Sequence, residues 1–98
     1  MEKQDVITAL AALAHETRLD VFRLLVQAGP QGMAAGVLAE ALDTPPATLS
    51  FHLKELRNAR LLVPERDGRS IRYAPDFASM AALMGYLGEN CCAGGSCD

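Results

Sequence analysis

Apolar residues recur at helical spacing in five stretches of the chain, a pattern typical of amphipathic helices packed on a core. The pattern predicts helices over residues 2–14, 16–28, 34–42, 44–59 and 76–88. Gly29 and Pro30 end the second helix, because glycine accepts a left-handed cap and proline cannot continue a helix. The side chains expected to face the core are Val6, Ile7, Leu10, Leu13, Leu19, Phe22, Leu25, Val26, Val37, Leu38, Ala41, Leu42, Phe77, Met80, Leu83, Met84 and Leu87.

The fourth predicted helix carries a buried stripe and a distinct outer face. Leu49, Leu53 and Leu56 follow each other at helical spacing and predict the buried stripe. Thr44 is predicted to cap the helix and Pro45 to occupy its first position, where no N–H is needed. The residues predicted to lie nearer to solvent are Ala47, Thr48, Phe51, Lys54, Glu55 and Asn58.

From residue 62 the spacing of apolar residues changes from that of a helix to that of a strand, and two short segments resemble β-strands. Residues 62–66 and 69–73 flank Asp67 and Gly68, a pair that favours a type I′ hairpin turn. Pro64 cannot donate a ladder hydrogen bond, so its strand is expected at an edge. The predicted order ααααββα is that of a winged helix-turn-helix fold, mainly α with a two-stranded hairpin wing (α+β). Residues 1–90 are expected to form one domain, and residues 91–98 a flexible tail.

Charge is distributed unevenly along the chain. The net charge is −3 and the pI about 5.3, which by themselves argue against a nucleic-acid partner. Residues 44–74 nevertheless carry a local charge of +3, and the remaining residues carry −6. This concentration of basic residues in the segment of the fourth helix and the hairpin predicts binding to double-stranded DNA.

The candidate DNA-binding residues lie on the fourth helix and the hairpin. Thr48, Ser50 and His52 carry short or ring-based polar groups suited to base edges or phosphates. The cationic side chains that we expect to contact phosphates are Lys54, Arg57, Arg66, Arg69 and Arg72. An alternative interpretation is an ordinary amphipathic helix with a solvated polar face, in which His52 is a buried hydrogen-bonding residue.

Three stretches of the sequence resemble the ArsR (SmtB/ArsR) family of metalloregulatory repressors. They are LAHETRL at residues 13–19, PATLSFHLKELRNARLL at residues 46–62 and DGRSIRY at residues 67–73. The resemblance implies a homodimer built from the first and last helices. It also implies DNA contact through the helix that holds Thr48, Ser50, Phe51 and His52, and release of the operator when a thiophilic ion binds.

All three cysteines, Cys91, Cys92 and Cys97, fall within the last eight positions. In a reducing cytosol such a cluster favours a metal or redox site over a structural disulfide. Three sulfurs without a neighbouring histidine suit a three-coordinate ion, As(III) or Sb(III), better than zinc, which prefers four ligands. Members of the family that sense arsenite often carry Cys-x-Cys on the third helix, and zinc sensors carry Asp and His on the last. Neither pattern is present in residues 32–42 or 76–88.

The sequence therefore predicts a cytoplasmic DNA-binding repressor without a resident cofactor, which As(III) or Sb(III) releases from its operator. No apolar run is long enough to span a membrane, and the first residues do not begin a signal peptide. Ser50 and His52 lie too close on one helix for a catalytic triad, so no enzymatic activity is expected. Two alternatives remain: the cysteines sense redox state or another thiophilic metal such as cadmium, lead or bismuth, or the chain is a thiol metal-handling protein that does not bind DNA.

Overall fold

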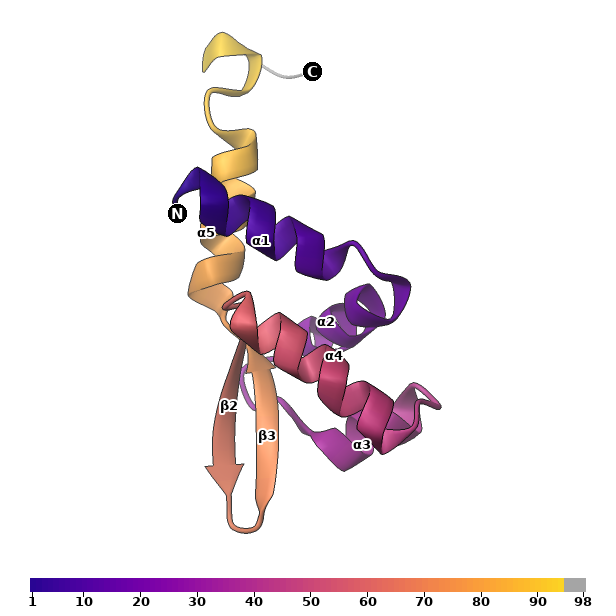
Figure 1. Ribbon diagram of the computed structural model, residues 1–98. Coiled ribbons are helices and arrows are strands. Elements are labelled where there is room, and N and C mark those ends of the chain that lie inside the picture. Colours follow the sequence, from indigo (N-terminus) through magenta and orange to yellow (C-terminus); the bar gives the residue numbers. More distant parts are fainter. Residues whose placement is uncertain (95–98) are drawn as a thin grey trace.

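The computed structural model describes residues 1–94 and consists of a helical body, a β-hairpin wing and a projecting last helix (Figure 1). The helices are α1 (Lys3–Leu13), α2 (Glu16–Ala28), α3 (Ala35–Ala41), α4 (Pro46–Asn58) and α5 (Phe77–Gly88). The strands are β1 (Met33–Ala34), β2 (Leu62–Asp67) and β3 (Ser70–Pro75), and a short 3₁₀ turn, η1 (Cys91–Gly94), follows α5. This arrangement confirms the predicted winged helix-turn-helix fold. The division into a domain and a tail at residue 90 stays a prediction.

The sheet has three antiparallel strands in the order β1-β3-β2, one more than the hairpin predicted from the sequence. Strand β1 has only two residues, too few to show an alternating pattern, and its Met33 lies opposite Tyr73 of β3. Gly32 makes this pairing possible: its φ is 68°, and a Cβ there would clash with the carbonyl oxygen of Tyr73. The added strand joins the wing to the start of α3.

The wing turn lies one residue later than predicted and is of another type. Asp67 pairs with Ser70, so Gly68 and Arg69 are the central residues of the turn. Gly68 has a positive φ of 63°, whereas Arg69 does not, which fits a type II′ turn. The predicted type I′ turn is wrong because it requires positive φ at both central positions.

Helix α4 also begins later than predicted, at Pro46. Pro45 is its N-cap residue, with extended backbone angles of φ −56° and ψ 140°. A residue that precedes proline is disfavoured in the helical region, so Pro45 cannot start the helix and Pro46 takes the first position. Thr44 is therefore not the cap, and its hydroxyl instead donates to the carbonyl of Leu42 at 3.1 Å.

Side chains from all five helices and the start of β2 contribute to one core. Leu49, Leu53 and Leu56 of α4 are buried as predicted. The fully or nearly fully buried residues elsewhere include Val6, Ala9, Val21, Phe22, Leu25, Leu38, Leu61, Leu62 and Leu83. Several side chains expected in the core are exposed instead: Ile7 and Leu10 of α1, Leu19 of α2, Val37 and Ala41 of α3, and Met84 and Leu87 of α5.

Helix α5 runs beside α1 and then extends past it, so that η1 lies at the end of the molecule opposite the wing tip (Figure 1). Asp76 caps α5 by accepting a hydrogen bond from the Ser79 backbone N–H at 3.0 Å. Leu83 is the buried residue of α5. None of the helices described combines the length and apolar character needed to cross a bilayer.

Candidate nucleic-acid interface

Helix α4 presents a polar outer face on the side away from its leucine stripe. Thr48, Ser50, Lys54 and Arg57 are all exposed, while Leu53 is only 2% exposed. Helix α3 packs against α4 and the chain turns between them, which gives the two-helix unit of a helix-turn-helix (Figure 1). In such a unit the second helix enters the major groove, so α4 is the candidate recognition helix.

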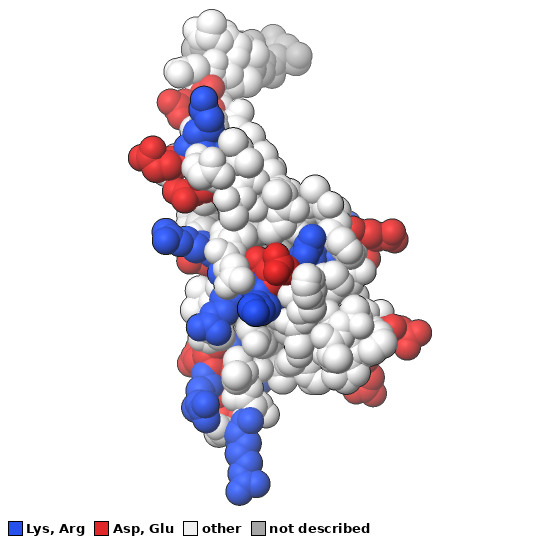
Figure 2. All heavy atoms as spheres, in the orientation of Figure 1, with Lys and Arg blue, Asp and Glu red and all other residues white. Residues whose placement is uncertain are grey.

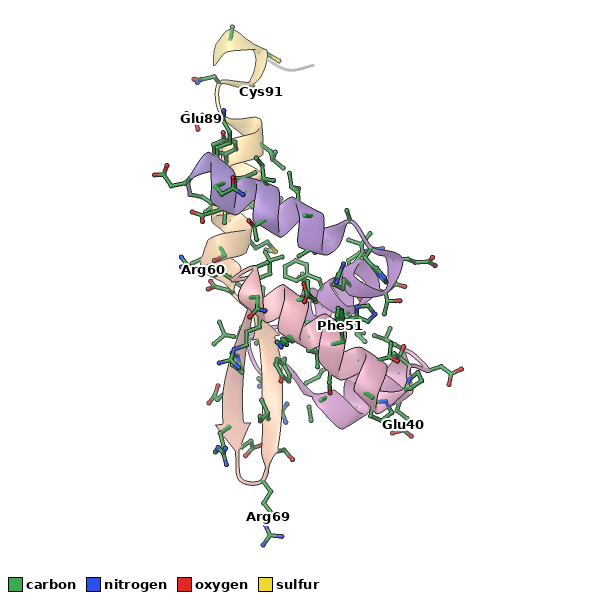
Figure 3. All side chains as sticks on the ribbon, viewed as in Figure 1. Glu40, Phe51, Arg60, Arg69, Glu89 and Cys91 are labelled. Carbon is green, nitrogen blue, oxygen red and sulfur yellow. The ribbon has the colours of Figure 1, made fainter. Side chains whose placement is uncertain are left out.

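The wing carries exposed positive charge beside this helix. Arg66 and Arg69 are both exposed, and Arg69 points away from the tip of the hairpin (Figure 3). Lys and Arg side chains line the wing edge of the molecule, while Glu40 lies on the opposite side (Figures 2 and 3). Acidic side chains also lie along this edge, but the side chain at the wing tip is basic (Figure 2). Phosphates of one duplex lying against α4 and the wing would meet the positive side.

Arg72 is held by contacts within the protein. Its Nε donates to the carbonyl of Gln31 at 3.0 Å, and its Nη2 donates to the carbonyl of Gly32 at 3.1 Å. Its Nη1 lies 3.9 Å from a carboxylate oxygen of Asp67. These bonds tie the segment before β1 to strand β3. The structure therefore gives Arg72 a structural role, whereas Arg66 and Arg69 are exposed on the wing.

His52 lies on the inner side of α4, buried as in the alternative interpretation, but the hydrogen bond that this interpretation expects is not among the described contacts. It is 8% exposed, and its ring packs against the ring of His15 with centroids 4.6 Å apart. Its Nδ1 is buried without a hydrogen-bond partner among the described residues. Burial lowers the pKa of His52, and the nearby His15 and Arg18 lower it further, against a smaller opposing effect of Glu55. His52 is thus not on the face formed by Thr48, Ser50 and Lys54.

His15 is a residue of this arrangement that sequence reasoning missed. It is the N-cap of α2, and its Nδ1 accepts a hydrogen bond from the Thr17 backbone N–H at 3.2 Å. The contact with His52 joins the start of α2 to the recognition helix. The only signal in the sequence is a polar residue directly before a helix, which indicates a cap and not its distant partner.

The predicted cysteine ligands are described only in part. The Sγ atoms of Cys91 and Cys92 lie 3.6 Å apart. Sulfurs at that separation can both bind one soft ion, since a zinc–sulfur bond is about 2.3 Å long. Cys97 lies outside the described residues, and within residues 1–94 no three potential ligands cluster as a metal site.

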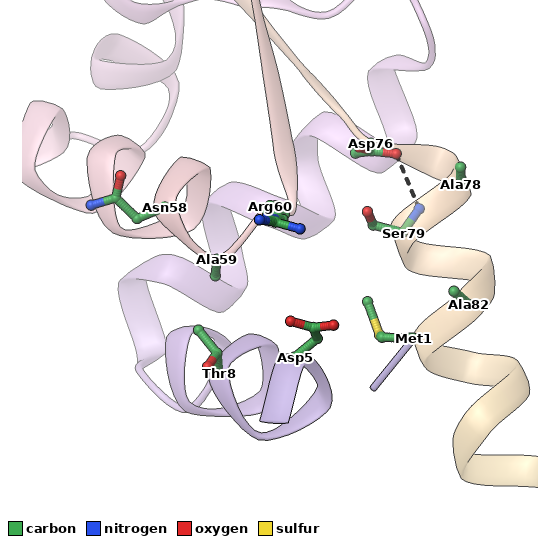
Figure 4. Close-up of a pocket in the computed structure, with 10 residues that line it drawn as sticks. All are labelled: Met1, Asp5, Thr8, Asn58, Ala59, Arg60, Asp76, Ala78, Ser79 and Ala82. Atoms are coloured by element: carbon green, nitrogen blue, oxygen red, sulfur yellow. Dashed lines mark hydrogen bonds between the residues drawn. The ribbon is translucent and has the colours of Figure 1, made fainter. Parts of the chain in front are cut away.

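A groove of about 500 Å³ lies where α1, the end of α4 and the start of α5 meet (Figure 4). Arg60, Asp5 and Asp76 contribute its charged groups. None of the predicted DNA-binding or cysteine residues lines it. The candidate interface is therefore the outer surface of α4 and the wing, and not this groove.

Comparisons with known proteins agree with this geometry. Residues 13–65 match the family model of a helix-turn-helix domain. NolR from Sinorhizobium fredii is 31% identical, with a TM-score of 0.70 over 88% of this chain and 83% of that one. No curated protein matches the sequence.

Two further solved structures are similar over most of the chain. An ArsR-like transcriptional regulator from Rhodococcus sp. RHA1 is 27% identical, with a TM-score of 0.76 over 86% of this chain and 76% of that one. The homodimeric winged helix-turn-helix DNA-binding domain of Mb0332 from Mycobacterium bovis, a possible ArsR-family transcriptional regulator, is 26% identical. Its TM-score is 0.70 over 97% of this chain and 88% of that one.

Proposed function

The chain belongs to the ArsR (SmtB/ArsR) family of helix-turn-helix, DNA-binding transcriptional regulators, and from this premise we propose that it is a repressor released by a thiophilic ion. In this proposal a homodimer occupies a double-stranded operator. As(III) or Sb(III) binds the thiolates of Cys91, Cys92 and Cys97 and lowers the affinity of the dimer for DNA.

The observation that carries the DNA-binding part is the joint exposure of the polar face of α4 and the arginines of the wing. Thr48 and Ser50 offer hydroxyls to base edges or phosphates, and Lys54 and Arg57 follow on the same helix. Arg66 on β2 and Arg69 in the hairpin turn add exposed positive charge on the wing. We exclude His52 and Arg72 from the direct contacts, because burial and internal hydrogen bonds already engage them.

A homodimer is supported by apolar side chains that the subunit leaves exposed on α1 and α5. Ile7 and Leu10 are 50% and 40% exposed, and Met84 and Leu87 are 65% and 59% exposed. Exposed apolar surface of this kind on neighbouring helices marks a protein interface. A twofold dimer would place two α4 helices in successive major grooves, about 34 Å apart.

The thiolate part rests on the chemistry of the cysteines and on their position. Thiolates are soft ligands, and three of them match the coordination of As(III) and Sb(III). Cys91 and Cys92 begin three residues after the end of α5, whose exposed apolar side chains belong to the proposed dimer interface. Drawing the tail into a fixed loop would therefore change the spacing of the two α4 helices. A coupling free energy of about 1–3 kcal/mol suffices for a 5- to 150-fold change in affinity.

The test is a titration of arsenite into the reduced protein bound to a duplex selected from a random pool. Arsenite should release the duplex from the wild-type protein. The Cys91→Ser, Cys92→Ser, Cys97→Ser variant should bind the same duplex and remain bound to it when arsenite is added. Persistence of the wild-type complex at saturating arsenite would contradict the thiolate part. Equal release of the serine variant would contradict it as well. Arsenic stoichiometry per chain and X-ray absorption at arsenic would report the number of sulfur ligands.

A redox response is the second candidate, favoured by the 3.6 Å approach of the Cys91 and Cys92 sulfurs. Release by peroxide that arsenite cannot reproduce would support it. Release by cadmium, lead or bismuth alone would instead support another thiophilic metal. A chain that handles metal without binding DNA would fail to select any duplex at low salt.

A further inference from the structure

Phe51 is a large apolar side chain in the middle of the polar outer face of α4. It is 51% exposed and lies on α4 (Figure 3), and Thr48 and Lys54, three residues before and after it, are on the same side of the helix. The leucine stripe on the other side of α4 accounts for the contact of this helix with the core, and Phe51 takes no part in it. The exposed half of this ring is apolar surface that a molecule bound to α4 can cover.

The ring of Phe51 rests on a chain of ring contacts. It meets the ring of His52 edge to face, with centroids 5.6 Å apart and an interplanar angle of 73°. His52 in turn packs against His15, which caps α2. Pairs of this geometry are favourable, so one side of the Phe51 ring is held while the other faces outward. His52 is thereby a positioning residue for Phe51.

The chemistry of the major groove restricts what such a ring can recognise. A phenyl ring has no hydrogen-bond donor or acceptor for the polar base edges. The C5-methyl group of thymine is the apolar group that a base pair presents in this groove. From the exposure and the fixed orientation of the ring, we infer that Phe51 reads a thymine methyl group in each half-site of the operator. This inference rests on the proposed function, because it assumes that α4 lies in the major groove.

Replacing thymine by uracil removes only this methyl group and so tests the inference directly. A duplex is first selected from a random pool by the wild-type protein, and each thymine is then replaced singly by uracil. We expect one position per half-site at which the replacement weakens wild-type binding by about fourfold, the usual effect of one buried carbon group. The same replacement should have no effect on binding by Phe51→Ala, because that variant has already lost the contact.

Leu19→Ala is the matched control, since Leu19 is also an exposed apolar residue, 43% exposed, but lies on α2. This variant should keep the thymine preference of the wild type. Indifference of the wild-type protein to every uracil replacement would overturn the inference while leaving DNA binding intact. A thymine preference retained in Phe51→Ala would assign it to another residue and would also overturn the inference. Failure to select any duplex would contradict the proposed function itself.

Discussion

Helices α4 and α5 both carry an apolar stripe in the sequence, but the subunit covers only one of them. Leu49, Leu53 and Leu56 of α4 are at most 2% exposed. On α5 only Leu83 is buried, and Met84 and Leu87 are more than half exposed. The two helices have nearly the same length, 13 and 12 residues, so the difference is one of environment and not of extent.

This difference shows that an apolar pattern in a sequence can reflect either packing within the subunit or surface that the folded subunit leaves exposed. The stripe of α4 fixes the recognition helix on the core of its own subunit, and it thereby directs the polar residues outward. The stripe of α5 is left over after the subunit has folded, and water-exposed apolar surface is favourably covered by another chain. Under the proposed function, this uncovered surface of α5 belongs to the dimer interface.

The largest expected effect on stability comes from truncating the covered stripe. Leu53→Ala should lower the free energy of unfolding by about 2–5 kcal/mol, because it removes buried methyl groups and leaves a cavity. The loss should be the same at every protein concentration, as measured by urea unfolding. Leu87→Ala is the comparison: its effect should decrease on dilution, to within about 0.5 kcal/mol once subunits separate. An equal, concentration-independent loss at both positions would mean that Leu87 packs within its own subunit.

Charging the uncovered stripe should separate the subunits. The double variant Met84→Glu, Leu87→Glu would place carboxylates in the proposed interface, where burial of an unpaired charge is strongly unfavourable. We expect the dissociation constant of the dimer to rise at least about 100-fold, equivalent to about 2.8 kcal/mol. Sedimentation equilibrium measures this directly, and circular dichroism should show that the helices persist. A dimer that survives both substitutions would show that α5 is not the interface.

A smaller effect is expected from the one buried polar side chain of α4. The pKa of His52 is lowered below its ordinary value of 6.5, so the unfolded chain takes up a proton at a higher pH than the folded chain does. The unfolded state therefore binds more protons as the pH falls below 6.5, and stability decreases until the folded pKa is reached. The slope contributed by His52 is at most about 1.4 kcal/mol per pH unit.

The measurement is the difference in urea midpoint between about pH 7.5 and pH 5.5, a range that spans the ordinary histidine pKa. His52→Gln should show a smaller difference than the wild type, whatever its absolute stability. His15, Arg18 and Glu55 lie around this ring and remain in the variant. An unchanged pH dependence in His52→Gln would assign the effect to other groups.

The smallest effect on stability is expected at the wing arginines. Arg66→Ala and Arg69→Ala should each change the free energy of unfolding by less than about 0.5 kcal/mol, because both side chains are exposed. Each should nevertheless reduce the slope of log affinity against log salt by about 1.8, because the homodimer carries the substitution twice and each lost phosphate contact accounts for about 0.9. Arg23→Ala on α2 is the matched control, since Arg23 is exposed and lies outside the interface. Equal slopes in the three variants would contradict phosphate contact by the wing.

Much of the fold was predicted from the sequence because its signals are local. The positions of the helices follow from apolar periodicity, and Gly29 and Pro30 end α2 at the predicted place. The start of α4 was wrong because Pro45 has to satisfy the restriction imposed by Pro46, which outweighs the capping preference of Thr44. Strand β1 was missed because only its pairing with β3 makes these two residues a strand, and two residues are too few to show a strand pattern in the sequence.

The candidate site shows the same division. The outward positions of Thr48, Phe51 and Lys54 follow from the phase of the leucine stripe, which the sequence alone contains. The sequence does not distinguish the roles of Arg66 and Arg72. Both are arginines in short strands, so the local pattern gives each the same expected role. Only the folded chain brings the carbonyls of Gln31 and Gly32 to the guanidinium of Arg72.

By itself, the sequence determined the order of the five helices and the hairpin, the inner and outer faces of α4, and the concentration of basic residues near its end. These depend on the spacing of residues within one segment, and helical and strand periods translate that spacing directly into faces. Only the tertiary structure decided that His52 meets His15, that Arg72 holds the segment before β1, and that the apolar side chains of α5 remain uncovered. Each of these facts depends on which distant segments come together, and a local pattern does not contain that information.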